Sequence, residues 1–283
     1  MLIQLDHVKK EYEDFTLELD MQIPENRVTG LIGANGAGKS TTFKLMLGLI
    51  RPDAGDVKVF EKKAGELSAE DRQKIGTVFS DSGFSEYLTV QQVGRIMQEF
   101  YLDFEPEQFY RRCEYFHIPQ KKKIKEFSTG MKAKLKILLA VSHDSRLLIL
   151  DEPTAGLDVI AREEILDLLR EYMEVPGRSV VLSSHISGDL EHFCDDLYMI
   201  DKGKIVLHEE TDRIMEEYGL LKMSEQEFTG LDKEYLLRVR KESFGYSCLT
   251  DQRTYYLENY PMIVNEKGNI DEVIAMLVKG ERV

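Results

Sequence analysis

Short runs of apolar residues recur along the chain and alternate with stretches of helical periodicity. Four runs have the length and composition of buried strands, at 28–32, 75–79, 147–150 and 179–184. Helical patterns follow at 42–49, 89–101 and 159–173. Strands that alternate with helices usually form a parallel sheet with helices packed on its faces. The pattern therefore predicts an α/β fold with a mainly parallel core sheet.

Two further regions carry strand patterns of a different kind. Residues 2–5 and 15–19 alternate apolar and polar side chains, which is typical of half-buried strands, and we expect an N-terminal antiparallel β subdomain. Later in the chain, two strands at 197–200 and 204–207 are joined by a turn. A short helix is expected to follow them at 211–218.

Residues 85–145 form a helical subdomain inserted between two of the buried strands. Thr89 and Gln92 have capping-box spacing for a helix that ends near 101, and a second helix is expected at 106–116. A third, amphipathic helix is expected at 132–141, after the sequence FSTGM. The basic run at 121–125 is interpreted as a solvated surface.

The last part of the chain, residues 219–283, is predicted to be a small accessory domain. Strand patterns occur at 244–249 and 262–264, and a helix is expected to begin after Asn269 and to reach 278. The sequence therefore predicts a domain at 1–218 followed by a small α+β appendage. Whether the appendage regulates, dimerises or covers the larger domain stays open.

Composition limits the possible partners and compartments. The 283 residues are 42% apolar, and the formal charge of −14 argues against a protein that binds nucleic-acid backbones. Three isolated cysteines indicate neither a disulfide framework nor a zinc site. No apolar run approaches the ~20 residues of a membrane helix, so we expect a soluble, cytoplasmic chain that serves any membrane through another polypeptide.

Residues 33–41, with the sequence GANGAGKST, match a phosphate-binding loop. The loop lies between a predicted buried strand and a predicted helix, which is the context that this motif requires. Its glycines let backbone N–H groups turn toward an anion, and the helix N-terminus adds a positive end. We expect Lys39 to reach the β- and γ-phosphates, Ser40 to bind Mg²⁺ and Thr41 to lie near the α-phosphate. The candidate nucleotide-binding residues here are Asn35, Gly36, Ala37, Gly38, Lys39, Ser40 and Thr41.

Polar residues at the ends of other strands complete a candidate catalytic site. Asp151 and Glu152 end the apolar run at 147–150, where Asp151 can hold Mg²⁺ and Glu152 can activate a water for attack on the γ-phosphate. His185 follows the strand at 179–184 and is expected to contact the γ-phosphate. Tyr12 could stack on a nucleotide base or pack on its own hairpin, and the residues alone leave both possibilities open.

The ordered motifs GANGAGKST, FSTGM, LLILDEP, AGLD and SSH resemble the nucleotide-binding subunits of ATP-binding cassette (ABC) transporters. The resemblance covers residues 2–218 and implies that Tyr12 stacks on adenine, that Glu152 is the general base and that His185 is the switch histidine. It also implies that Ser128 and Gly130 contact the γ-phosphate held by an opposite subunit, with Asp158 as the cross-dimer aspartate. ATP and Mg²⁺, a homodimer or heterodimer of such subunits, and a separate membrane permease are the implied ligands and partners.

Two motifs depart from the family pattern. The usual LSGGQ is FSTGM here, although the serine and second glycine are retained as Ser128 and Gly130. At the position of the usual coupling glutamine the chain has Ser80, whose side chain is too short to span the same gap without water. Asp81 is the nearest alternative ligand, and the sequence does not choose between them.

Alternative functions account for less of the sequence. A soluble ATPase acting on nucleic acid or ribosomes would be expected to have two cassettes, a long coiled coil or a basic surface. A GTPase or small-molecule kinase would leave FSTGM unexplained, and the base-reading motif N-K-x-D is absent from the sequence. The tail resembles those of bacterial single-cassette exporters of peptides and antibiotics, although the residues do not exclude import.

Overall fold

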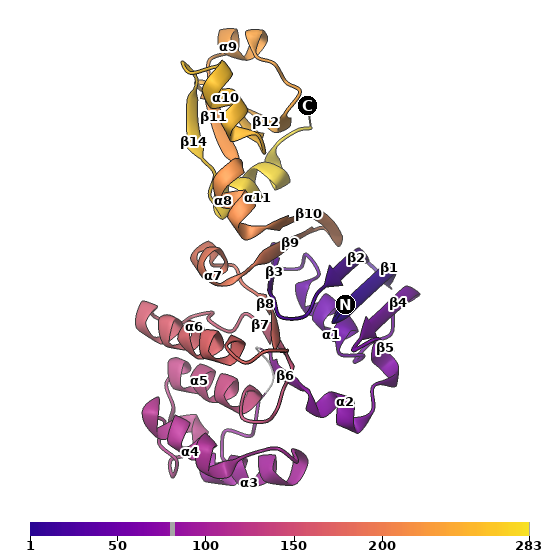
Figure 1. Cartoon of the computed structure of the whole chain (residues 1–283), viewed down its shortest axis with the longest axis vertical. Helices are drawn as coiled ribbons and strands as arrows, with labels where there is room; N and C mark the ends of the chain where they lie inside the picture. Colours follow the sequence, from indigo (N-terminus) through magenta and orange to yellow (C-terminus); the bar gives the residue numbers. More distant parts are fainter. Residues whose placement is uncertain (80–82, 283) are drawn as a thin grey trace.

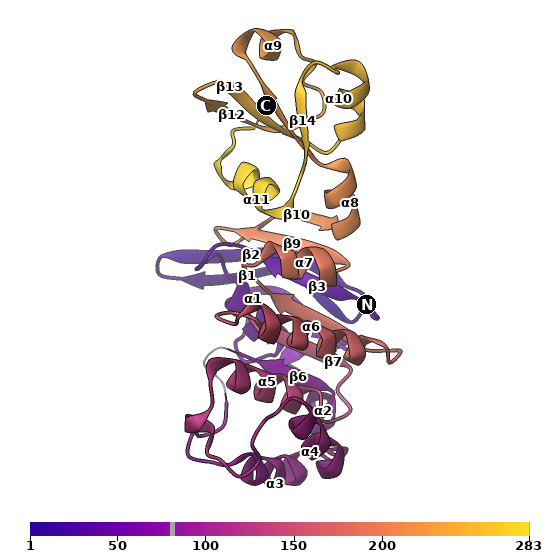
Figure 2. The same ribbon diagram turned by 90° about the vertical axis from the view of Figure 1, so that its left-hand side faces the viewer.

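The computed structural model describes residues 1–79 and 83–282 and has three parts stacked along its long axis (Figure 1). A large sheet with its helices occupies the middle. A helical subdomain lies at one end, and a small domain formed by the C-terminal residues lies at the other. The view at right angles shows the same order of parts (Figure 2).

The ten strands of the large sheet run in the order β5-β4-β1-β2-β10-β9-β3-β8-β7-β6. The segment from β9 to β6 is entirely parallel, as the sequence predicts. Its strands are β3 (Val28–Ile32), β6 (Ile75–Val78), β7 (Leu147–Asp151), β8 (Ser179–Ser183) and β9 (Asp196–Asp201). Because β3, β7 and β8 are buried on both faces, their sequences are continuous apolar runs rather than alternating ones.

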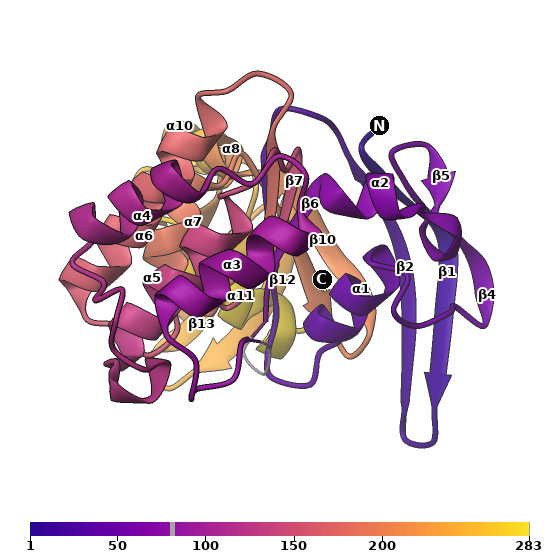
Figure 3. The ribbon, with the colours of Figure 1, turned by 90° about the horizontal axis from the view of Figure 1, so that it is seen from below.

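The rest of this sheet is mainly antiparallel and includes the N-terminal hairpin. Its strands are β1 (Ile3–Tyr12), β2 (Phe15–Ile23), β4 (Ala54–Val59), β5 (Lys62–Lys63) and β10 (Lys204–Glu210). Buried and exposed residues alternate along β2 because one of its faces meets solvent. The β1–β2 hairpin projects from the molecule (Figure 3), and one parallel bridge between β2 and β10 joins it to the parallel strands.

Helices on the two faces of the sheet enclose two apolar cores. They are α1 (Lys39–Met46), the short η1 (Ala64–Glu66), α2 (Ala69–Gln73), α6 (Val159–Met173), α7 (Ser187–Phe193) and α8 (Thr211–Glu217). Successive residues of β7 belong to opposite cores, with Leu148 and Leu150 in one and Leu147 and Ile149 in the other. This arrangement follows from the two-residue period of a strand.

The helical subdomain contains α3 (Val90–Phe100), α4 (Pro106–Tyr115), η2 (Ile124–Glu126) and α5 (Thr129–Ala140). The capping box predicted for Thr89 and Gln92 is formed at the start of α3. The prediction that the third helix begins at 132 is wrong by one turn. It begins at Thr129 because the Ser128 hydroxyl accepts a hydrogen bond from the Met131 N–H and caps the helix.

The C-terminal domain is a four-stranded antiparallel sheet, in the order β12-β13-β11-β14, with three helices. Its elements are β11 (Gly219–Met223), α9 (Glu225–Gly230), β12 (Leu236–Glu242), β13 (Gly245–Thr250), α10 (Arg253–Asn259), β14 (Val264–Lys267) and α11 (Ile270–Lys279). The strand predicted at 262–264 lies instead at Val264–Lys267. Leu220, Leu249 and Ile270 join the apolar core of the larger domain, so the two parts pack directly against each other.

The helices that the structure describes include none that is both long enough and apolar enough to span a bilayer.

Candidate nucleotide site

The loop between β3 and α1 depends on glycines that no other residue can replace without strain. Gly38 has φ of +122°, and a Cβ there would lie 2.4 Å from Leu17 Cδ1. A Cβ on Gly33 would lie 2.3 Å from the carbonyl oxygen of Ile200. The loop therefore passes close to its neighbours and turns directly into α1, whose N-terminal end is attractive to anions.

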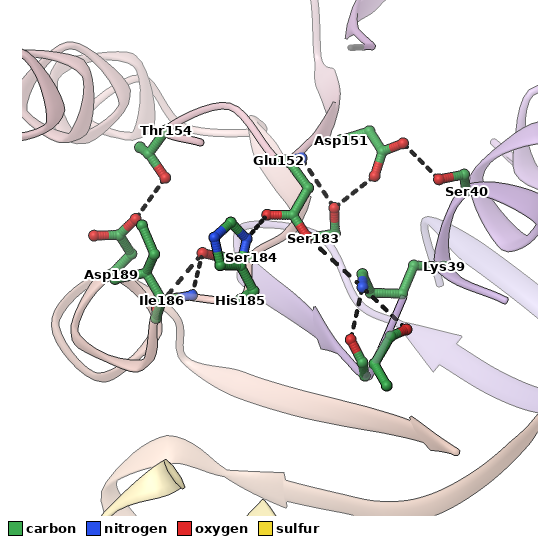
Figure 4. A network of polar contacts seen from close by, with 12 residues as sticks. Lys39, Ser40, Asp151, Glu152, Thr154, Ser183, Ser184, His185, Ile186 and Asp189 are labelled. Carbon is green, nitrogen blue, oxygen red and sulfur yellow. Dashed lines mark hydrogen bonds and ion pairs between the residues drawn. The ribbon is translucent and has the colours of Figure 1, made fainter. Parts of the chain in front are cut away.

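Lys39 is the first residue of α1, and its side chain is only 7% exposed. Its Nζ donates a hydrogen bond of 2.6 Å to the Gly33 carbonyl oxygen and lies 3.7 Å from Glu152 Oε1. The ammonium group is thus enclosed by the phosphate-binding loop and by the acidic residue at the end of β7 (Figure 4). A buried positive charge in this position suits a polyanionic ligand.

A cleft of about 500 Å³, which we call the Lys39 cleft, opens over this loop. It is lined by Tyr12, Phe15, Ala34, Asn35, Gly36, Gly38, Lys39, Ser40, Thr41, Lys44, Asp151 and Glu152. Of the loop residues predicted to bind nucleotide, only Ala37 is absent from the lining; it is buried. The structure thus brings the predicted phosphate-loop residues together with both predicted carboxylates.

Ser40 and Asp151 provide the oxygen atoms that suit Mg²⁺. The Ser40 hydroxyl donates to Asp151 Oδ2 at 2.7 Å across the cleft. Hydroxyl and carboxylate oxygens are the hard ligands that Mg²⁺ prefers, and this ion usually takes its other ligands from water and phosphate. Among the described residues, no group of three or more His, Cys, Asp or Glu side chains is arranged to hold a metal ion. Ser40 and Asp151 would supply two oxygen ligands to a Mg²⁺ ion that takes the others from phosphate and water.

Ser183 bonds to both acidic residues, to the carboxylate of Asp151 and to the backbone of Glu152, and was not identified from the sequence as a site residue. Its hydroxyl donates to Asp151 Oδ1 at 2.7 Å and accepts from the Glu152 N–H at 2.9 Å (Figure 4). Glu152 has φ of +52°, a left-handed conformation that costs energy in a non-glycine residue. The parallel register that pairs Asp151 with Ser183 places this hydroxyl where it supports the turn.

His185 lies beside Glu152 in this structure. Its Nδ1 is 2.5 Å from Glu152 Oε2, and its side chain is 58% exposed. The sequence predicts that His185 is at the phosphate edge of the sheet, and the contact places it next to the predicted catalytic carboxylate. The pair can share a proton or orient each other.

A second polar group supports the loop that follows Glu152. Thr154 donates a hydrogen bond of 2.6 Å to Asp189 Oδ2, and Arg162 lies 3.7 Å from the other oxygen of that carboxylate. Burial raises the pKa of Asp189, while the Thr154 hydrogen bond and the Arg162 charge act in the opposite direction. Sequence reasoning missed Thr154 and Asp189 because α7, which carries Asp189, was not predicted.

Tyr12 ends β1 at the outer wall of the cleft. Its side chain is 46% exposed, and its ring centroid lies 6.3 Å from that of Phe15 across the hairpin. Lys10 Nζ is 5.9 Å from the same ring centroid. The ring is thus packed on its hairpin and open to the cleft, which is compatible with both possibilities left open by the sequence.

Ser128, Gly130 and Asp158 lie at the starts of α5 and α6 and form a separate group, which we call the α5–α6 group. A Cβ on Gly130 would lie 3.4 Å from the Ala161 Cβ, and Asp158 caps α6 by accepting from the Ala161 N–H at 2.9 Å. The start of α5 therefore packs beside the start of α6. None of the three residues is among the described residues that line the Lys39 cleft of the same chain.

Ser80 and Asp81, the candidates for the position of the usual coupling glutamine, lie outside the described residues.

The phosphate-binding loop at the start of α1, together with carboxylates at the end of the neighbouring parallel strand, defines a P-loop nucleoside triphosphatase. The family model described as "ABC transporter" matches residues 17–155. The chain is 33% identical to the lantibiotic transport ATP-binding protein SrtF of Streptococcus pyogenes, over 75% of this chain and 92% of SrtF. It is 30% identical to the linearmycin resistance ATP-binding protein LnrL of Bacillus subtilis, over 84% of this chain and 79% of LnrL.

A solved structure of the ATP-binding subunit of an ABC transporter has 26% sequence identity and a TM-score of 0.68, and the match covers 76% of this chain and 92% of that one. The chain therefore belongs to the ABC transporter family and is an ATP-hydrolysing subunit of that class. These relatives do not favour the alternative of an ATPase that acts on nucleic acid or ribosomes.

Proposed function

We propose that the chain binds ATP and Mg²⁺ in the Lys39 cleft and hydrolyses ATP to drive a separate membrane permease. Residues 1–218 form the ATP-binding domain in this proposal, and residues 219–283 form an accessory domain. The observation that carries the proposal is the convergence of Lys39, Ser40, Asp151 and Glu152 on one cleft at the carboxyl edge of parallel strands.

Each of these residues has a distinct role. Lys39 and the loop N–H groups hold the β- and γ-phosphates, and Tyr12 stacks on the adenine. Ser40 and Asp151 hold Mg²⁺, which neutralises phosphate charge when bound. Glu152 accepts a proton from the attacking water, and His185, beside it, contacts the γ-phosphate.

The active sites are proposed to be shared between two such subunits. Ser128 and Gly130 belong to the α5–α6 group outside the Lys39 cleft of their own chain, so they are available to a neighbour. In a head-to-tail pair they contact the γ-phosphate of the opposite chain, with Asp158 at the interface. Either two copies of this chain or this chain and a related one can form the pair.

We further propose that the transported substrate is a peptide or antibiotic-like molecule and that the direction is export. This part is supported by the similarity to SrtF and LnrL, whose names refer to lantibiotic transport and linearmycin resistance. The chain then works at the cytoplasmic face of the cell membrane, where the permease holds it.

The substitution Glu152→Gln tests the catalytic proposal. Removal of the base while the Lys39 and Ser40 contacts remain should lower kcat for ATP about 100-fold or more, with ATP affinity retained. Steady-state phosphate release and equilibrium ATP binding measure the two effects. Glu99→Gln, the same change at an exposed residue of α3, is the control and should behave as the parent. Hydrolysis at the parent rate by the Glu152 variant would contradict the role of Glu152.

The same variant tests export in cells of the source organism. A chromosomal Glu152→Gln allele should lower the concentration of a lantibiotic or of linearmycin that inhibits growth, while Glu99→Gln should not. Unchanged inhibition by every such antibiotic tried would overturn the substrate class but not the ATPase assignment.

A further inference from the structure

The short helix α7 is coupled to His185 by a tight turn. It begins at Ser187, two residues after His185. The Ile186 N–H donates to Ser184 Oγ at 3.0 Å, and the Asp189 N–H donates to the Ile186 carbonyl oxygen at 3.2 Å. The connection between His185 and α7 is therefore short and hydrogen-bonded, so we expect a displacement of α7 to displace the imidazole.

The C-terminal domain contacts α7 through the first residues of α11. The Ser187 hydroxyl donates to Asp271 Oδ2 at 2.8 Å, and the Ile270 N–H donates to Glu191 Oε1 at 3.2 Å. Beneath these contacts Leu190 and Ile270 are both buried members of the same apolar core. The accessory domain therefore binds α7 with paired polar groups and with apolar packing, rather than through a linker alone.

Asp189 on α7 is also bound to the catalytic loop. It is 2% exposed and accepts the Thr154 hydrogen bond from the loop that follows Glu152 (Figure 4). The helix is thus held between the loop of the predicted base and the C-terminal domain. The contact of 2.5 Å between His185 and Glu152 lies at the end of this chain of interactions.

We propose that the C-terminal domain positions His185 through α7 and so sets the rate of ATP hydrolysis, with Asp271 as a positioning residue. The inference rests on the proposed roles of Glu152 and His185. It gives the accessory domain a defined role, because α11 bound to α7 holds the imidazole against the catalytic carboxylate. Release of α11 leaves His185 free to move away from Glu152.

A double-mutant cycle on the Ser187–Asp271 bond tests this proposal. Ser187→Ala and Asp271→Ala should each lower kcat about fivefold, close to the 1 kcal/mol that one such hydrogen bond contributes. The KM for ATP should change less than about twofold, because the phosphate contacts are intact. Since both substitutions remove the same bond, the double variant should be no slower than either single one.

Two further variants distinguish a loss of His185 positioning from a general loss of folded structure. Asp271→Asn retains an oxygen acceptor for the Ser187 hydroxyl and should recover most of the parent kcat. Lys279→Ala, at the far end of α11, removes a charge away from α7 and should leave kcat unchanged. A thermal melt of each variant verifies that its fold is intact.

A tryptophan reporter measures α7 directly, because the chain contains no tryptophan. In a Phe193→Trp background, where Phe193 is the last residue of α7, Asp271→Ala should raise acrylamide quenching of the indole and Lys279→Ala should not. The inference would be overturned if the Ser187 and Asp271 variants kept the kcat and the quenching of the parent. It would also be overturned if the two substitutions lowered kcat additively in the double variant. An inactive parent, or a fully active Glu152→Gln, would instead overturn the proposed function.

Discussion

Ser183 shows how one buried hydroxyl can support two neighbouring acidic residues, one through its carboxylate and the other through its backbone. It is fully buried and bonds to Asp151 Oδ1 and to the Glu152 N–H. The positive φ of Glu152 is unfavourable, and a hydrogen bond to that residue's own N–H offsets part of the cost. Ser183 therefore bonds to the side chain of the proposed metal ligand Asp151 and to the backbone of the predicted base Glu152.

Ser183→Ala should impair activity more than its effect on stability would suggest. The buried groups left without a partner should lower the free energy of unfolding by about 1–3 kcal/mol. Loss of a group that orients a metal ligand should also lower kcat about tenfold or more.

Ser179→Ala is the matched control, since Ser179 lies on the same strand, is fully buried and accepts from the Asn26 N–H at 2.9 Å. Chemical denaturation and ATPase rates should show both variants destabilised but only Ser183→Ala slowed. Equal rates for the two variants would remove Ser183 from the support of the site.

At the scale of elements, sequence patterns predicted the parts that have strong periodicity. The strand Val28–Ile32 and the helix Val159–Met173 lie where the sequence placed them, because one is wholly buried and the other carries a long apolar face with an Asp158 cap. Lys39 and Ser40 were identifiable from the motif GANGAGKST between a strand and a helix. The carboxylates Asp151 and Glu152 were identifiable because they end a buried parallel strand, and such strands bring their carboxyl ends to one edge.

Other elements could not be predicted because their local sequence is ambiguous. The helix α7 is only seven residues long and has no side-chain cap, and β12 carries charged residues at four of its seven positions, in the sequence LLRVRKE. Their structure is fixed by packing between distant segments, such as α7 against α11. The support given by Asp189 and Asp271 depends on that packing, so no local motif indicated it.

The helix α2 (Ala69–Gln73) offers a test of pH dependence at this scale. Ser68 and Asp71 form a capping box, and Lys62 Nζ lies 2.7 Å from Asp71 Oδ1. The hydrogen bond from Lys62, followed by those from Ser68, lowers the pKa of Asp71 to about 2.

Because the folded-state pKa is lowered, Asp71 stabilises the fold above its unfolded-state pKa, and this contribution is lost as the pH falls toward 2. Asp71→Asn should therefore be less stable than the parent at pH 7, with the difference shrinking between about pH 4 and pH 2. Urea unfolding across this range measures the difference. A constant gap in stability between Asp71→Asn and the parent across this pH range would contradict the assignment.

At the scale of the whole molecule, the chain has two separate groups of residues that we propose act on nucleotide. One is the Lys39 cleft, and the other is the α5–α6 group with Ser128, Gly130 and Asp158. The second group lies outside the cleft of its own chain, so under the proposed function a complete site would require a partner subunit. The C-terminal domain lies at the end of the molecule opposite the helical subdomain (Figure 1), and its contact through α11 is with α7.

Shared sites predict complementation between two inactive variants. Lys39→Ala removes the phosphate charge, and Ser128→Arg places a bulky cation where the opposite γ-phosphate should lie, so each homodimer should be inactive. In a mixed dimer one site carries both defects and the other carries neither. Phosphate release should therefore reappear on mixing, with a maximum near equal amounts of the two proteins.

The controls require proof that mixed dimers of the two variants have formed. Differently sized tags on the two variants, with gel filtration in the presence of ATP, provide that proof. Lys39→Ala mixed with itself under two tags should stay inactive at every ratio. If Lys39 and Ser128 instead served one site within a chain, every site in the mixture would carry a defect, and no activity would return. Absence of recovery in verified mixed dimers would thus contradict either the shared site or the ability of one sound site to turn over alone. Single-turnover hydrolysis separates these two explanations, because a sound shared site would still cleave one ATP per mixed dimer.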